Sequence, residues 1–594
     1  LKTNTTANNN TAVGHCSLTL NTTGTRNTGT GKSSLQANTT GSCNSGHGMY
    51  ALYNNTEGGN NVAVGTCSLF TNTTADNNTA VGFCSLYANT TGSENTAVGH
   101  ESLKANTTGA KNTAVGKNAG SAITTGTFND IFGRSAGFDL TTGDYNVAVG
   151  SGSLANLTTT NDNTAVGHNA LNTVVTGTQN TAVGTCALHN TTVNCGTAVG
   201  YQALKLNTTG DKNTAVGRNS ANNNTTGSDN TVVGFCSLGT NTTGACNTAF
   251  GNYSLYSNTT ANDNSAFGYN TLGLNTTGTN NVAMGRNALL NNTTASNNTA
   301  VGKDALTANT TASENIAMGF CSLGSNTTGC RNVAMGVNAL KSQSGNAHCN
   351  TAIGYNAMIY NDSGGCNTAV GALALETNSS SDNCNTAVGV RALCSNQGNN
   401  NVAVGALALD KNAAANNNAA VGTLALACNT TGASNVAVGF QALNSNTTAS
   451  NNVAVGEDAL KDTTTGCQNI AMGRNALEDN STGDLNVALG YNALKTNTTA
   501  DNNVAVGANA LLDNTTGFRN VSIGHSALAN NTTAGNSQAI GYNALGTNTT
   551  GCQNTAIGSQ ALNTNTTGSN NVALGISSLY NNTEGSNNIA IGCA

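Results

Sequence analysis

From Asn10 to Leu18 the chain reads Asn-Thr-Ala-Val-Gly-His-Cys-Ser-Leu, and this pattern returns along its whole length. Its glycine, Gly14, recurs at Gly31 and Gly48 and continues at a spacing of 17 residues to Gly592. There are 35 such anchor glycines, and only four of the intervals depart from 17, two being 16 and two 18 residues long. A fixed period of this kind indicates a repeat architecture.

The repeat is described here by positions relative to the anchor glycine, which is position 0. The consensus has Asn at −4, Thr or Val at −3, Ala at −2 and Val, Ile or Met at −1. Ala or Ser follows at +3, Leu at +4, Asn-Thr-Thr at +7 to +9 and Gly or Ala at +10. The remaining positions vary.

A repeat of 17 residues is too short for a helical hairpin, and Asn, Thr and Gly are poor in helix interiors. Short β segments separated by Gly and Asn turns fit better. We therefore predict an all-β solenoid, or β-roll, of 35 coils, with the anchor glycine at a sharp bend where a positive φ is one conformation that glycine permits at little cost. We expect residues 1–594 to form a single continuous repeat domain and a segment of a longer fibre.

Neighbouring strand residues point to opposite faces, so −1 and −2 differ in environment. Position −1 is large and apolar, whereas −2 is nearly always Ala. The interpretation is that the large residues fill the coil and the alanines pack against another chain. This predicts a parallel homotrimer, in which the oligomer-packing residues include Ala63, Ala249, Ala283 and Ala573.

The Asn-Thr-Ala-Val-Gly-x-x-Ala/Ser-Leu unit resembles the head repeats of trimeric autotransporter adhesins of the YadA type and the β-roll repeats of phage-type tail fibres. The segment from Asn118 to Gly143, with its Thr-Thr-Gly triplets, is especially similar to tail-fibre repeats. The resemblance covers essentially the whole chain. It implies a parallel homotrimer of left-handed β-rolls on a cell or virion surface, acting as an extracellular adhesin or fibre shaft. The coils are longer than those of adhesin heads, and no coiled-coil stalk is written in this segment.

Composition excludes several function classes. Charged residues make up 8% of the chain, against about 25% in typical domains, and the formal net charge is −6. Because the basic residues are few and scattered, we expect no nucleic-acid partner. No apolar run of about 18 residues occurs, so no membrane span is expected in this segment.

No catalytic, metal or cofactor site is expected, and we interpret the chain as a non-enzyme. Residues 29–33, Gly-Thr-Gly-Lys-Ser, end like a phosphate-binding loop, but the pattern needs a glycine where Arg26 stands. Four of the seven histidines occupy the variable position +1 in separate coils. Acidic residues are too sparse for calcium-binding β-roll motifs.

The 18 cysteines concentrate at positions +2, −5 and −6. Equivalent residues of adjacent coils should lie about 4.8 Å apart, which is within the Cα range of a disulfide. The alternatives are staples within or between chains and free thiols that replace Ser, Thr or Ala. The candidates for disulfides are Cys67, Cys84, Cys186, Cys195, Cys236, Cys246, Cys321, Cys330, Cys349, Cys366 and Cys384.

The Asn-Thr-Thr triplets at +7 are acceptor sequences for N-glycosylation. The alternative is a corner ladder of hydrogen-bonded Asn and Thr side chains, which we favour. Candidate glycosylation sites include Asn21, Asn72, Asn207, Asn326 and Asn548.

The sequence therefore favours an extracellular structural fibre or adhesin shaft that assembles with itself, end to end as well as side by side, and attaches to a cell or host surface. The alternatives are an ice-binding solenoid and an Asn-rich, amyloid-like matrix filament. Against ice binding, the threonines at +8 and +9 are consecutive and point to opposite sides.

Overall fold

The computed structural model describes residues 1–173, 176–343, 345–378 and 382–593. The chain is all-β and forms a parallel β-solenoid with one three-residue strand in each coil, as predicted. It falls into two compact units, Leu1–Asn297 and Asn298–Ala594, which are described separately. Among the described residues, no helix has the length and apolar character needed to cross a bilayer.

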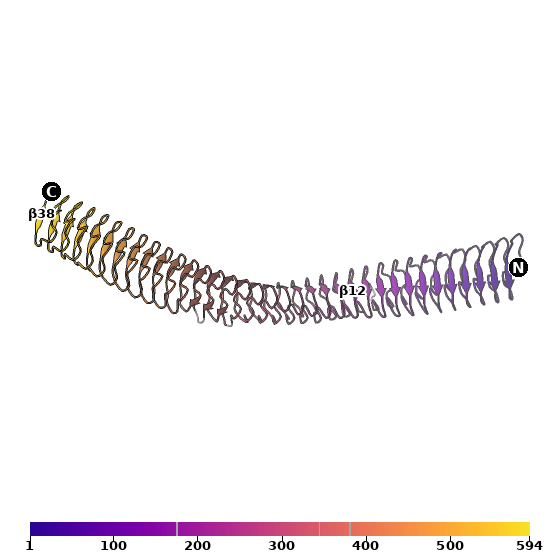
Figure 1. Ribbon diagram of the computed structural model, residues 1–594. Helices are drawn as coiled ribbons and strands as arrows, with labels where there is room; N and C mark the ends of the chain where they lie inside the picture. Colours follow the sequence, from indigo (N-terminus) through magenta and orange to yellow (C-terminus); the bar gives the residue numbers. More distant parts are fainter. Residues whose placement is uncertain (174–175, 344, 379–381, 594) are drawn as a thin grey trace. The chain divides into compact units, whose positions relative to one another are not determined.

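In the first unit, drawn from indigo to magenta in Figure 1, each coil contributes one strand that pairs in parallel with its neighbours. Equivalent residues stand in register, for example Thr214 beside Thr231. The strands are β1 (Thr11–Val13), β2 (Thr28–Thr30), β3 (Ser45–His47), β4 (Val62–Val64), β5 (Thr79–Val81), β6 (Thr96–Val98), β7 (Thr113–Val115), β8 (Asp130–Phe132), β9 (Val147–Val149), β10 (Thr164–Val166), β11 (Thr181–Val183), β12 (Thr197–Val199), β13 (Thr214–Val216), β14 (Thr231–Val233), β15 (Thr248–Phe250), β16 (Ser265–Phe267) and β17 (Val282–Met284).

The second unit repeats this arrangement and adds a short second sheet. Its main strands are β18 (Thr299–Val301), β19 (Ile316–Met318), β20 (Val333–Met335), β21 (Thr351–Ile353), β23 (Thr368–Val370), β25 (Thr386–Val388), β27 (Val402–Val404), β28 (Ala419–Val421), β29 (Val436–Val438), β30 (Val453–Val455), β31 (Ile470–Met472), β32 (Val487–Leu489), β33 (Val504–Val506), β34 (Val521–Ile523), β35 (Gln538–Ile540), β36 (Thr555–Ile557), β37 (Val572–Leu574) and β38 (Ile589–Ile591). The second sheet consists of β22 (Tyr360–Asn361), β24 (Thr377–Asn378) and β26 (Ser395–Asn396).

The bend at the anchor glycine is confirmed. Gly14 has φ +132°, and a Cβ there would lie 2.5 Å from the carbonyl oxygen of Gly31, the next anchor. Both the conformation and the close stacking therefore require glycine. Three further positions, −5, +2 and +4, have left-handed backbone in most coils although they are rarely glycine, as at Arg26, Ser33 and Leu35.

The two faces of the strand point in directions opposite to those predicted. Position −2 faces the interior: Ala63, Ala249, Ala283 and Ala573 are all 0% exposed. Positions −3 and −1 point outward, so the large residues at −1 do not fill the coil. Assigning the alanines to a contact with another chain was wrong, because a side chain enclosed by its own coil cannot reach a neighbour.

Position −2 holds a small residue in most coils, and in some coils even a methyl group would not fit without a shift of its neighbours. In the second coil this position is Gly29, and a Cβ there would meet Ser17 Oγ at 2.5 Å and Leu18 Cγ at 3.5 Å. Ser17 and Leu18 occupy +3 and +4 of the preceding coil and are buried. The core thus consists of Ala at −2, Ala or Ser at +3 and Leu at +4, closed at both corners by buried Asn.

Candidate functional site

The candidate site is the outward strand face, which we define as the side chains at −3 and −1 of consecutive coils. At −1, Val13, Phe250 and Met284 are 60%, 37% and 45% exposed. The rings of Phe250 and Phe267 stack with centroids 5.4 Å apart. A contiguous row of exposed apolar side chains commonly marks a surface that binds a partner.

The Asn-Thr-Thr triplets lie at a corner whose asparagines point inward. The Nδ2 of Asn72 donates to Asn55 Oδ1 at 2.7 Å and to the carbonyl oxygen of Ala75 at 3.1 Å. The favoured hydrogen-bonded ladder is confirmed at this corner. The five candidate glycosylation residues, Asn21, Asn72, Asn207, Asn326 and Asn548, are all 0% exposed. Glycosylation at these asparagines, the alternative that was not favoured, does not fit the folded coil, since the interior has no room for a glycan.

A second buried ladder runs through the asparagines at −4, immediately before the strand. The Oδ1 of Asn61 accepts the backbone N–H of Asn78 at 2.9 Å. The Nδ2 of Asn61 donates to the carbonyl oxygen of Ala75 at 2.8 Å. Asn61 thus satisfies backbone groups at both ends of the Asn corner, which explains why Asn recurs at this position. The Nδ2 groups of Asn78 and Asn315, at −4 of other coils, are buried without such a partner.

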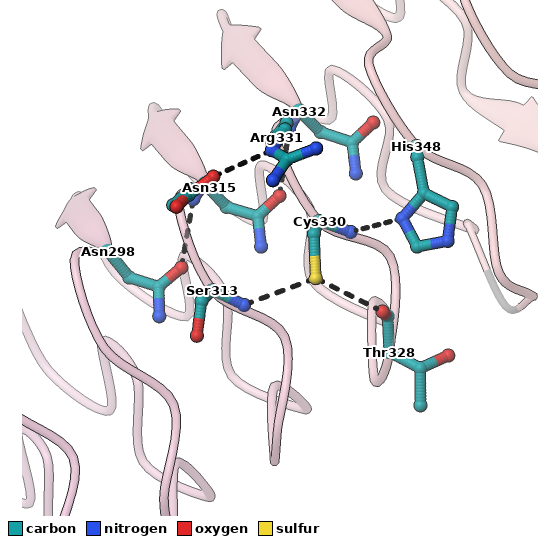
Figure 2. A network of polar contacts seen from close by, with 9 residues as sticks. Asn298, Ser313, Asn315, Thr328, Cys330, Arg331, Asn332 and His348 are labelled. Atoms are coloured by element: carbon teal, nitrogen blue, oxygen red, sulfur yellow. Dashed lines mark hydrogen bonds and ion pairs between the residues drawn. The ribbon is translucent and has the colours of Figure 1, made fainter.

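A third ladder occupies the surface at −6, and it explains three of the cysteines. Figure 2 shows Cys330, whose Sγ accepts the backbone N–H of Ser313 at 3.4 Å and lies 3.6 Å from the carbonyl oxygen of Thr328. His348 then accepts the N–H of Cys330 through Nδ1 at 2.9 Å. Cys467 and Cys552 accept equivalent N–H groups, as Asp, Asn and Ser do in other coils.

The other candidate cysteines occupy two rows. In the row at +2, one cysteine is buried, Cys84, and four are half-buried: Cys67, Cys186, Cys236 and Cys321. In the row at −5, all the candidates are exposed: Cys195, Cys246, Cys349, Cys366 and Cys384. All are free thiols in this structure, and disulfide pairing remains a prediction.

The structure brings Cys67 and Cys84 together. Burial raises the pKa of both thiols, and a hydrogen bond joins their side chains. It also aligns Cys349, Cys366 and Cys384 on consecutive coils, where the Cys366 N–H donates to His348 O at 3.0 Å. One coil contains both Cys186 and Cys195. In that coil, the Sγ of Cys195 lies 3.4 Å from the Oε1 of Gln179.

The search for motifs along the sequence missed a charged cluster around Cys394. Its Sγ lies 3.3 Å from Glu376 Oε2, and Arg391 pairs with Asp410 at 3.3 Å. Burial, assisted by Glu376, raises the pKa of the Cys394 thiol to about 12. Glu376, Cys394 and Asp410 all stand at +5, so aligning the repeats by their anchors could have identified the cluster.

The same row carries an aromatic ladder that sequence reasoning also missed. The rings of Tyr53, Phe70 and Tyr87 stack in consecutive coils with centroids 5.1 Å apart. Because the rings cover one another, the ladder mainly stabilises neighbouring coils.

Other kinds of site find little support in the described residues. No group of three or more His, Cys, Asp or Glu side chains is arranged to hold a metal ion there. Surface hollows have volumes of 180 Å³ beside Cys236 and Tyr256 and 260 Å³ beside Asn530 and Asn563. These volumes fall below the roughly 300 Å³ at which ligand pockets begin.

Comparison with protein-family models gives no match, and comparison with curated proteins gives none either.

Proposed function

We propose that this chain is an extracellular structural fibre or adhesin shaft that works by self-association of its coils and attachment to a cell or host surface. The observation that carries the proposal is the outward strand face, where an exposed or half-exposed apolar side chain stands at −1 in most coils of each unit. Position −3 beside it is mainly Thr in the first unit and mainly Val or Ile in the second. We therefore assign the contact with a second copy to this face instead of to the alanines at −2, because the side chains at −3 and −1 point outward.

The size of the face fits an assembly surface. The described part of the first unit presents 17 strands, and strands lie about 4.8 Å apart. With a width of roughly 10 Å for three residues, the face covers roughly 800 Å² on each chain. Stable protein interfaces bury about this area per partner.

A parallel homotrimer remains the preferred assembly, because the resemblance to adhesin and tail-fibre repeats implies one. Three copies around a common axis would turn their outward strand faces toward that axis. The apolar side chains at −1 would then leave water, and each buried aliphatic side chain would contribute favourably to association.

A mass measurement of the native assembly tests this proposal. We expect a trimer under both reducing and non-reducing conditions, and trimer dissociation only on reduction would show that disulfides between chains hold it. Val64→Asp and Val81→Asp place charges on the outward strand face and should weaken the assembly. Thr74→Asp, at an exposed position +9, is the control. A wild-type monomer at micromolar concentration would contradict the proposal.

A further inference from the structure

Of the 22 Lys, Arg, Asp and Glu residues in the first unit, 15 lie along the two borders of the outward strand face, and one, Asp130, lies on the face itself. One border is position +1, one residue beyond the anchor glycine. The other comprises positions −5 and −6, just before the strand-side Asn. Because each border contains equivalent positions of successive coils, it forms a row along the unit.

The row at +1, which we name the basic edge, carries no acidic residue in this unit. Its charged side chains are all exposed, and three histidines, His15, His100 and His168, lie in the same row. The Lys and Arg residues of the basic edge are Lys32, Lys117, Arg134, Arg218 and Arg286.

The row at −5 and −6, which we name the acidic edge, carries seven carboxylates against the three cations Arg26, Lys111 and Lys212. All seven are exposed or half-exposed. The acidic residues are Asp76, Glu94, Asp144, Asp162, Asp211, Asp229 and Asp263.

The two edges do not neutralise each other within the chain. In the described part of the first unit, the ion pairs are those of Glu101 with Lys104 and His100. Arg218 stacks between Tyr201 and Phe235, with centroid distances of 5.7 and 5.8 Å. Among the described residues of this unit, none of the five Lys and Arg side chains of the basic edge forms an ion pair with a carboxylate, although, besides the hydrogen bond from Lys104, the charge of Lys117 helps lower the pKa of Glu101.

We infer that the basic edge of one chain lies against the acidic edge of the next copy, and that this contact favours the parallel arrangement of the proposed assembly over an antiparallel one. This inference rests on the proposed self-association. A symmetry axis along the solenoid brings unlike edges together, whether it relates two copies or three. A two-fold axis across the solenoid brings like edges together, and this repulsion disfavours the antiparallel arrangement.

The test uses charge reversal in the full chain. One variant changes three residues of the acidic edge to lysine, as in the coils that already carry Lys111 and Lys212: Asp162→Lys, Asp229→Lys and Asp263→Lys. A second variant changes three residues of the basic edge to glutamate, as at Glu457 in the second unit: Lys117→Glu, Arg134→Glu and Arg218→Glu. A third variant combines all six changes.

We expect each three-residue variant to raise the apparent dissociation constant at low salt at least about tenfold, since several exposed ion pairs are lost. The six-residue variant should recover most of this loss, because its edges are again of opposite sign. A matched control, Glu57→Lys, Asp139→Lys and Asp513→Lys, makes the same charge change at positions +9 and +6 and should change assembly much less. High salt should weaken the wild-type assembly.

Orientation is measured separately with a C-terminal tag visible by electron microscopy. Tags at one end of each particle are expected, whereas tags at both ends would overturn the edge contact and the parallel homotrimer and leave only self-association through the outward strand face standing. Unchanged assembly in both three-residue variants, or no recovery in the six-residue variant, would also overturn the inference. A wild-type monomer would contradict the proposed function itself.

Discussion

Asn38 donates from Nδ2 to the Oδ1 of Asn21 at 2.7 Å, inside the coil and one period away in sequence. The same amide donates to the carbonyl oxygen of Gly41 at 2.9 Å. A buried side chain thus joins one coil to the previous one and also closes its own corner. This relationship, repeated at +7, stabilises the solenoid in addition to its apolar core.

Removing one member of the ladder should destabilise the coils on both sides. Asn72→Ala leaves Asn55 Oδ1 without its donor and removes the acceptor of Asn89. We expect a loss of about 1–3 kcal/mol in the free energy of unfolding. Hydrogen exchange should locate the loss in the neighbouring coils, because repeats communicate mainly with their neighbours. Thr74→Ala, at exposed position +9, should be nearly neutral, and an equal effect of both changes would contradict the ladder's role.

Anchor glycines should resist substitution far more than other glycines of the same coil. Gly541 has φ +137°, and an added Cβ would lie 2.5 Å from Gly558 O. We expect Gly541→Ala to lose at least about 2 kcal/mol, from left-handed strain and collision. Gly546 stands at +5, where Ala529 occurs one coil earlier, so Gly546→Ala should be tolerated. Urea midpoints of the two variants compare them directly, and similar midpoints would argue against the anchor requirement.

The period was enough to predict the coil and the glycine bend, because the stacking of equivalent residues depends only on spacing and on small residues at bends. It did not determine which face of the strand points inward. Val at −1 is the larger residue, and size alone suggested the interior. The structure fills the interior from +4 instead, with Leu35 in a left-handed conformation.

That conformation could not be foreseen, since leucine rarely adopts positive φ and carries no turn signal. Once leucine at +4 points inward, only a small residue fits opposite it, as Gly46 does beside Leu35, and the alanines at −2 belong to the core. The Asn ladder at +7 was favoured from the sequence, but only the backbone path shows that its side chains point inward. The charged edges became visible once the strand face was known to point outward.

Of the cysteines that the structure describes, Cys394 should react most slowly with an alkylating reagent. Its pKa is raised to about 12 by burial and by the neighbouring Glu376 carboxylate. Because the thiolate is the nucleophile, only about one thiol in ten thousand is ionised at pH 8. Iodoacetamide should therefore label Cys394 far more slowly than exposed Cys384, at a rate that rises about tenfold per pH unit until pH approaches 12.

Glu376→Gln provides the control for this prediction. Removing the carboxylate charge should lower the pKa of Cys394 and accelerate its labelling, while burial keeps it slower than Cys384. Peptide mass mapping of labelled protein measures both rates in one sample. Equal labelling of the two cysteines at pH 8 would contradict the environment assigned to Cys394.

Ile131 and Gly137 form a compensating pair in the coil that departs most from the consensus. Ile131 replaces Ala at −2 and is fully buried; Gly137 replaces Leu at +4, where an added Cβ would lie 3.1 Å from Ile131 Cδ1. Gly137→Leu alone should overpack the coil, and Ile131→Ala alone should leave a cavity, each at a cost of about 2–4 kcal/mol.

The double variant restores the Ala and Leu of ordinary coils, whose leucines, such as Leu154, share the positive φ of Gly137. Its stability should exceed that of either single variant, which a double-mutant cycle of urea unfolding measures. Additive losses would mean that the two side chains do not share the same space.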